Sequence, residues 1–156
     1  MSLTNLPEVW MRGPVEGIAP ELQPVAHSLL QVREEIERFA ADLSSDQLWA
    51  RPGGAGAIGF HLRHIAGATD RLLTYARDES LTPEQLAFLK AEGLPGDPPA
   101  GAAETLAIAC AAIDDALAQV RRTDVSTLFE ARGIGRAKLP TTVLGLLFHA
   151  AEHATR

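Results

Sequence analysis

Apolar residues recur at helical spacing in four long segments of this 156-residue chain, and this pattern restricts its fold more than any other feature. The segments are Pro20 to Leu43, Ile58 to about Ala76, Ala102 to Arg122, and Pro140 to the last residue. In each segment apolar side chains return every three or four positions, which places them on one face of an α-helix. Helices of this kind bury their apolar faces against one another. The sequence therefore predicts an all-α protein, a four-helix bundle.

An extra short helix is predicted between the second and third long helices. Thr82, Pro83 and Gln85 supply an N-cap, a proline at the first helical position and a capping-box glutamine. Gly93 then ends this helix. Residues 129–139 contain two glycines among alternating basic residues, and we interpret them as an extended loop. No segment of the chain is a convincing strand.

Length and charge restrict the class of protein. A chain of about 100–200 residues usually forms one domain, so we expect a single domain over residues 1–156. With 14 Lys and Arg against 20 Asp and Glu, the formal net charge is −6, which argues against binding to nucleic acid or anionic membranes. No signal peptide or membrane span is predicted. The acidic net charge makes small molecules the expected partners. Cys110 is the only cysteine, so no intramolecular disulfide can form and the expected location is the cytoplasm.

Two histidines in the last predicted helix, His149 and His153, are the leading candidates for a functional site. Their i, i+4 spacing places both rings on one side of the helix, where they can bind the same metal ion. Both flank an apolar stripe that would face a neighbouring helix, and burying unpartnered imidazoles is costly. The pair predicts two ligands of one metal ion, with two surface histidines as the alternative interpretation.

The same stretch, from His149 through Glu152 to His153, matches the H-x-x-E-H pattern of inverted zinc peptidases, in which the glutamate is a general base. Those enzymes are much larger and take a further carboxylate ligand from downstream, whereas only three residues follow His153 here. We therefore reject a peptidase and expect the third ligand from earlier in the chain. No catalytic residue is assigned. Glu152 is a candidate that could orient an imidazole, act as a base or lie exposed.

Three earlier histidines are candidates for the third ligand. His27 lies off the apolar face of the first helix, which favours a solvated position. His61 and His64 are spaced i, i+3 in the second helix, so one ring can bind the metal while the other supports it. His61 lies closer to the centre of the apolar stripe and His64 lies at its edge. The apolar pattern alone therefore favours His61 as the ligand over His64.

The histidines and the short motifs around them follow a characteristic order along the chain. One histidine stands in the second helix, within Leu62-Arg63-His64-Ile65-Ala66-Gly67, and a His-x-x-x-His pair stands in the last. In this order the chain resembles the DinB-like superfamily over nearly its whole length. The resemblance implies a four-helix bundle that holds a divalent metal, commonly zinc or nickel, on three histidines. The matching positions are His64, His149 and His153, with His61 as a supporting or alternative ligand.

The resemblance also implies an activity and an assembly. Characterised relatives include transferases and isomerases that use thiols such as bacillithiol, mycothiol or glutathione, and family members often form dimers. Metal-dependent thiol transfer to a small molecule is therefore the expected activity, and a homodimer the expected assembly. A non-catalytic metal-binding or stress-associated bundle is the alternative. In the family the last helix usually continues well past its second histidine, so the sequence leaves open whether the chain is truncated and the site fully occupied.

Other residues are interpreted as structural or auxiliary. Cys110 lies on the apolar face of the third long helix and is expected to be a buried hydrophobic residue rather than a nucleophile. Trp10 and Trp49 flank the first helix and are expected to pack there or to contribute to a dimer contact. Basic residues before the last helix could line a mouth over the metal, with a solvated loop as the default. These residues are Arg132, Arg136 and Lys138.

Overall fold

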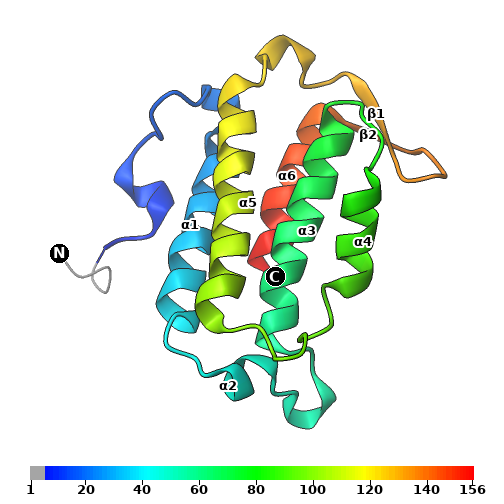
Figure 1. Cartoon of the computed structure of the whole chain (residues 1–156). Coiled ribbons are helices and arrows are strands. Elements are labelled where there is room, and N and C mark those ends of the chain that lie inside the picture. Colours follow the sequence, from blue (N-terminus) through cyan, green and yellow to red (C-terminus); the bar gives the residue numbers. More distant parts are fainter. Residues whose placement is uncertain (1–5) are drawn as a thin grey trace.

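Four helices form the body of the protein, shown in Figure 1 as a computed structural model whose described residues are 6–156. They are α1 (Gln23–Ala40), α3 (Ile58–Ala76), α5 (Ala102–Arg122) and α6 (Val143–Thr155). Helix α3 packs against α5 and α6, and α1 packs against the same two helices. The described chain is mostly helical, as predicted. The boundaries of α3 and α5 coincide with those expected from the apolar periodicity.

Shorter elements connect these helices. Helix α4 (Pro83–Ala91) follows α3, as predicted. Helix α2 (Ser45–Trp49) lies between α1 and α3 in the chain. In α4 the Thr82 hydroxyl accepts a hydrogen bond from the Gln85 backbone N–H at 3.2 Å, and Gln85 Oε1 accepts one from the Thr82 N–H at 2.9 Å. The capping box read from the sequence is therefore confirmed. Single-turn 3₁₀ segments occupy Val9–Arg12, Pro20–Leu22, Pro52–Gly54 and Val125–Thr127.

A β-hairpin precedes α6, and here the prediction of an extended loop was wrong. Strands β1 (Ala131–Ile134) and β2 (Leu139–Thr142) pair antiparallel. The chain turns between them through left-handed conformations at Gly135 and Lys138. The last helix also begins later than predicted, because the Thr142 hydroxyl accepts a hydrogen bond from the N–H of Gly145 at 3.0 Å and thereby caps α6.

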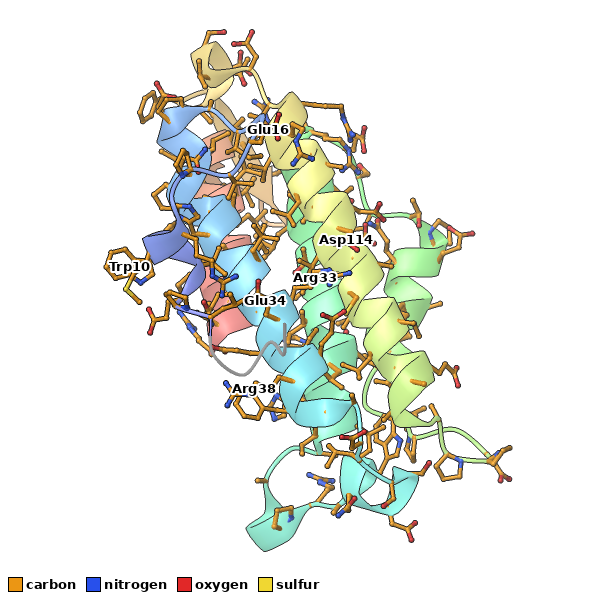
Figure 2. The ribbon with its side chains drawn as sticks, turned by 90° about the vertical axis from the view of Figure 1, so that its left-hand side faces the viewer. Trp10, Glu16, Arg33, Glu34, Arg38 and Asp114 are labelled. Atoms are coloured by element: carbon orange, nitrogen blue, oxygen red, sulfur yellow. The ribbon has the colours of Figure 1, made fainter. Side chains whose placement is uncertain are left out.

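The hydrophobic core lies between α1, α3, α5 and α6. Its completely buried side chains come from several elements and include Leu22, Leu29, Ile113, Val120, Leu146 and Leu147. On the surface, Arg33 of α1 forms an ion pair with Asp114 of α5, with 2.8 Å between Nε and Oδ1, and the two residues face each other in Figure 2. Within residues 6–156, no helix is long and apolar enough to cross a bilayer.

Helices α3 and α6 run antiparallel, and α6 ends about halfway along α3 (Figure 1). The last turn of α6 therefore lies beside the first half of α3, with His153 next to His64. Helix α4 covers another side of α3 (Figure 1). This arrangement brings α3, α4 and α6 together around the histidines singled out in the sequence.

Candidate metal centre

His64 and His153 meet where α3 and the last turn of α6 pack together. The two residues are 89 positions apart in the chain, yet their Nε2 atoms are 2.9 Å apart and their ring centroids 5.0 Å apart. The rings meet edge to face, and the His64 side chain is about one third exposed. The structure therefore brings together two of the three predicted ligands, one from each helix.

His149 lies one helical turn before His153 on the same side of α6. Its ring centroid is 5.5 Å from that of His153, and its side chain is half exposed. Its Nδ1 atom is 3.3 Å from Glu152 Oε2, which confirms that Glu152 lies close to this ring. Within residues 6–156, no group of three or more His, Cys, Asp or Glu side chains is close enough together to hold a metal ion. The third predicted ligand is therefore adjacent to the pair but does not converge with it.

The pair itself has the chemistry of a transition-metal site. Imidazole nitrogens bind zinc at about 2.0–2.1 Å, so two ligands of one tetrahedral ion lie about 3.3 Å apart. The two Nε2 atoms at 2.9 Å need to separate by only a few tenths of an ångström. Burial, followed by the nearby charge of His64, lowers the pKa of His153, which favours the neutral imidazole that metals bind. The donor atoms present therefore fit a divalent metal ion.

Glu92, at the C-terminal end of α4, is a residue of this site that the sequence analysis missed. Its Oε1 atom lies 2.8 Å from His64 Nδ1, and its side chain is 6% exposed. Its other oxygen is 3.4 Å from Nη1 of Arg71. One signal was available: Glu92 directly precedes the predicted helix stop at Gly93. A carboxylate there opposes the helix dipole, so it needs compensating partners.

Glu152 is a poor candidate for a general base. Its Oε1 atom accepts a hydrogen bond from the guanidinium of Arg156 at 2.5 Å. This contact is the main reason why the pKa of Glu152 lies below its ordinary value, with His149 adding to the effect. A carboxylate whose pKa is lowered takes up a proton less readily. Glu152 lies near the His149 ring, but their 3.3 Å contact is long for a hydrogen bond, so a role in orienting that ring stays a prediction.

The remaining two histidines lie apart from the pair. His61 is exposed; its ring packs edge to face against Phe60, with 5.1 Å between centroids, and lies over Gly56. His27 makes a hydrogen bond through Nε2 to the carbonyl oxygen of Gly13 at 3.0 Å. Of the three earlier histidines, His64 is thus the one that the fold places against His153.

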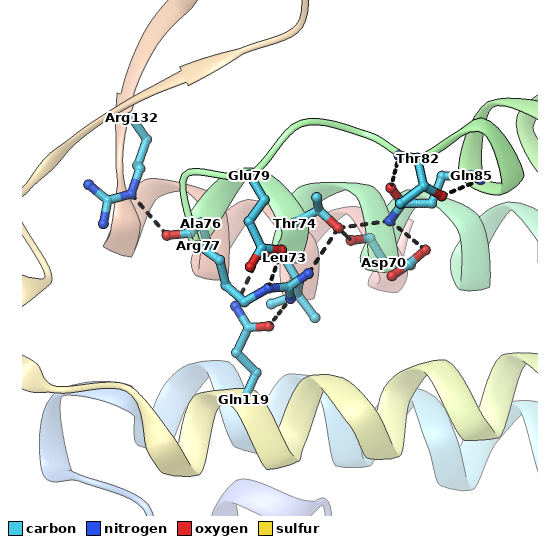
Figure 3. A network of polar contacts seen from close by, with 10 residues as sticks. All are labelled: Asp70, Leu73, Thr74, Ala76, Arg77, Glu79, Thr82, Gln85, Gln119 and Arg132. Atoms are coloured by element: carbon cyan, nitrogen blue, oxygen red, sulfur yellow. Dashed lines mark hydrogen bonds and ion pairs between the residues drawn. The ribbon is translucent and has the colours of Figure 1, made fainter.

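The basic residues of the hairpin do not line a mouth over the histidines, and Arg136 and Lys138 are exposed, in keeping with the default interpretation of a solvated segment. Arg132 donates from Nε to the carbonyl oxygen of Ala76 at 2.9 Å, at the C-terminal end of α3 (Figure 3). His64 lies twelve residues earlier in α3, about 18 Å along the helix axis. Arg136 lies in the hairpin turn, and Lys138 follows it there. The hairpin therefore belongs to the opposite end of α3.

The other expected structural residues have identifiable contacts. Cys110 is buried, as predicted, and burial raises the pKa of its thiol. Trp49 donates from Nε1 to the carbonyl oxygen of Ala100 at 2.9 Å, and the Arg63 guanidinium lies 5.7 Å from its ring centroid. Trp49 is therefore a packing residue. Trp10 projects away from the helices in Figure 2 and is exposed.

Comparison with known proteins shows the family of the chain. No curated protein matches the chain significantly. Residues 28–156 match the family model of the DinB superfamily, which is generally metal-associated. The matched range covers most of the chain and contains His64, His149 and His153. The chain therefore belongs to the DinB superfamily.

Proposed function

We propose that this protein is a metal-dependent four-helix bundle in which His64, His149 and His153 bind one divalent ion, zinc or nickel. The bundle helices are α1, α3, α5 and α6. The observation that carries the proposal is the meeting of the His64 and His153 Nε2 atoms at 2.9 Å across two helices. Nitrogen atoms that converge in this way suit a shared ion.

His149 completes the proposed site by a movement of its own side chain. It is half exposed and lies one turn from His153, so its ring has room to turn toward the pair. The contact with Glu152 at 3.3 Å is long for a hydrogen bond and exposed to water, so its loss costs little. His149 and His153 stay on the same side of α6 during this movement, because the helix itself does not change.

We further propose that the site acts on small molecules through a thiol. Three neutral imidazoles leave coordination positions open, and an ion bound there would lower the pKa of a coordinated thiol and hold it as a thiolate. The partial exposure of His64 and His149 gives small molecules access to this point. Transfer of the whole thiol to an electrophilic substrate is therefore the leading activity: the thiolate sulfur forms a bond to the electrophilic atom, and the leaving group of the substrate departs with the bonding electron pair. A homodimer remains a prediction, which analytical ultracentrifugation would test.

A structural ion is the second candidate function, and the position of the ligands favours it. His64 belongs to α3, whereas His153 belongs to the last turn of α6. A shared ion would therefore fasten the end of α6 to α3. In this case removing the metal lowers stability, and the protein shows no turnover with any thiol.

Metal content tests the proposal directly. We expect untagged protein to bind about one zinc or nickel ion per chain, and His64→Ala, His149→Ala and His153→Ala each to lose stoichiometric binding, because each removes a ligand. Elemental analysis and zinc titration measure this. His27→Ala is the matched control and should bind as the unaltered protein does. Absence of binding by the unaltered protein, or full binding by His64→Ala, would contradict the proposal.

A thiol panel separates the two candidate functions once metal is bound. The metal-loaded protein is incubated with bacillithiol, mycothiol or glutathione and an electrophilic acceptor. Product formation that His64→Ala abolishes supports the transferase. No product with any thiol, together with a lower unfolding temperature after chelation, supports the structural ion instead.

A further inference from the structure

Glu92 is buried in a way that the fold of α4 alone does not explain. Within residues 6–156 it is the only charged residue that is buried. It stands at the C-terminal end of α4, where the helix dipole disfavours a negative charge. Helix α4 has no buried side chain within Pro83–Ala91. The burial of Glu92 must therefore be compensated by the groups it contacts on α3.

The face of α3 that receives α4 is shaped around this carboxylate. A Cβ atom added at Gly67 would lie 2.8 Å from Glu92 Oε2 and 2.7 Å from Arg71 Nη1, so a larger residue would displace both. One turn earlier, Arg63 donates from Nη1 to the carbonyl oxygen of Leu94 at 2.5 Å. Together these contacts fix the end of α4 on both sides of Glu92.

The other end of α4 is also attached to α3. Gln85 donates from Nε2 to Asp70 Oδ2 at 2.8 Å and to Thr74 Oγ1 at 2.7 Å (Figure 3). With both ends attached, α4 cannot rotate about its axis without breaking these hydrogen bonds. The position of the Glu92 carboxylate is thus determined by how the whole of α4 is held against α3.

The contact with Glu92 decides which ring nitrogen of His64 carries the proton. A carboxylate accepts hydrogen bonds and cannot donate them, so at 2.8 Å His64 Nδ1 must be the donor. In neutral His64 the lone pair is then on Nε2, the atom that faces His153. This is the tautomer that a metal bound through Nε2 requires.

We propose that Glu92 is a positioning residue that holds His64 as the Nδ1–H tautomer and presents the Nε2 lone pair toward His153. Its relevance to metal binding rests on the function proposed above, whereas the tautomer is a property of the metal-free protein as well. A purely structural role, in which Glu92 only forms an ion pair with Arg71, makes a different prediction. In that role the tautomer of His64 does not depend on Glu92.

The test compares variants that keep the packing of the buried pair. Replacing one member of a buried ion pair leaves the other unpaired, whereas replacing both by apolar residues of similar volume is often neutral for stability. The double variant Glu92→Met with Arg71→Met therefore removes the acceptor for His64. Arg71→Met alone is the matched control: Glu92 loses one partner but keeps His64, which lies closer at 2.8 Å, so the acceptor for His64 stays in place. Glu92→Gln is the conservative variant, because its amide oxygen still accepts from Nδ1–H.

Nitrogen-15 NMR of histidine-labelled, metal-free protein reads the tautomer directly. We expect Nδ1–H for His64 in the unaltered protein, in Arg71→Met and in Glu92→Gln. In the double variant we expect a shift to Nε2–H, which free imidazole side chains prefer. Nε2–H in the unaltered protein, or Nδ1–H retained in the double variant, would overturn the proposal.

Zinc titration then connects the tautomer to the metal. The double variant should bind zinc about 10–100-fold more weakly than Arg71→Met, as expected when a hydrogen-bond partner of a metal-binding histidine is lost. Glu92→Gln should recover part of this loss. Equal affinities of the double variant and its control would contradict a positioning role. If no variant and no unaltered protein binds zinc, the proposed metal function fails, while the NMR result still decides the role of Glu92.

Discussion

At the scale of single residues, Gly67 controls how closely α4 approaches α3. An added Cβ would come within 3.0 Å of three side chains at once, those of Arg71, Phe88 and Glu92. Glycine inside a helix is usually a cost of about 0.5–1 kcal/mol relative to alanine. At this position the missing side chain leaves the space that the Glu92 carboxylate occupies. The glycine is therefore explained by the partner helix rather than by α3 itself.

Gly67→Ala should consequently destabilise the protein, although alanine favours helix. Overpacking costs about 1–3 kcal/mol, which exceeds the propensity gain and leaves a net loss of roughly 1 kcal/mol. Urea denaturation followed by circular dichroism measures the change. Gly93→Ala is the control, because its added Cβ would be in ordinary contact, 3.8 Å from Phe60. Equal or greater stability of Gly67→Ala relative to this control would refute the packing argument.

At the scale of elements, local signals in the sequence defined the helices but not the hairpin. The apolar periodicity of α3 and α5 is long enough to give their boundaries, and Thr82 with Gln85 marked the start of α4. Strands β1 and β2 have four residues each, too few to show a period of two. Their pairing is a contact between separate segments, which propensity does not reveal.

The same distinction applies to the candidate site. His149 and His153 follow from spacing within one helix, whereas choosing His64 over His61 required the resemblance to a family. Glu92 was missed because its partner His64 is 28 positions away in the chain. A hydrogen bond between two helices leaves no periodic pattern in the sequence, so only the fold could reveal it.

Loss of the N-cap of α4 should lower the local stability of α4 and leave the other helices unchanged. Thr82→Ala removes the hydroxyl that accepts from the Gln85 N–H and should cost about 1 kcal/mol, expressed as faster amide exchange within α4. Hydrogen–deuterium exchange with mass spectrometry resolves the segment. The matched control is Ser44→Ala, which removes the equivalent cap of α2. If α4 exchanges equally fast in both variants, its cap does not act locally.

At the scale of the whole molecule, the buried side chains of α6 hold His149 and His153 in place. Leu146 is completely buried, and it lies on the same short helix as His149 and His153. The packing of that helix against α1 and α3 determines where the two imidazoles lie. Loss of core packing in α6 should therefore affect both stability and metal binding.

Leu146→Ala should lower the free energy of unfolding by about 2–5 kcal/mol, because it removes a fully buried side chain and leaves a cavity. It should also weaken zinc binding. Leu94→Ala is the control, since this leucine is 62% exposed and should change stability by less than about 0.5 kcal/mol. Thermal unfolding with and without zinc measures both effects. A loss in Leu146→Ala no larger than that of the control would mean that α6 is not part of the cooperative core.

Helix α4 has a different relation to the core, since none of its helical residues is buried. Segments with few buried apolar contacts open at a small fraction of the global unfolding free energy. Each opening of α4 would carry Glu92 away from His64 while α1, α3, α5 and α6 remain folded. In those moments His64 would lose its hydrogen-bond partner although the three histidines stay on folded helices, so a bound ion would be held less tightly without any unfolding of the core.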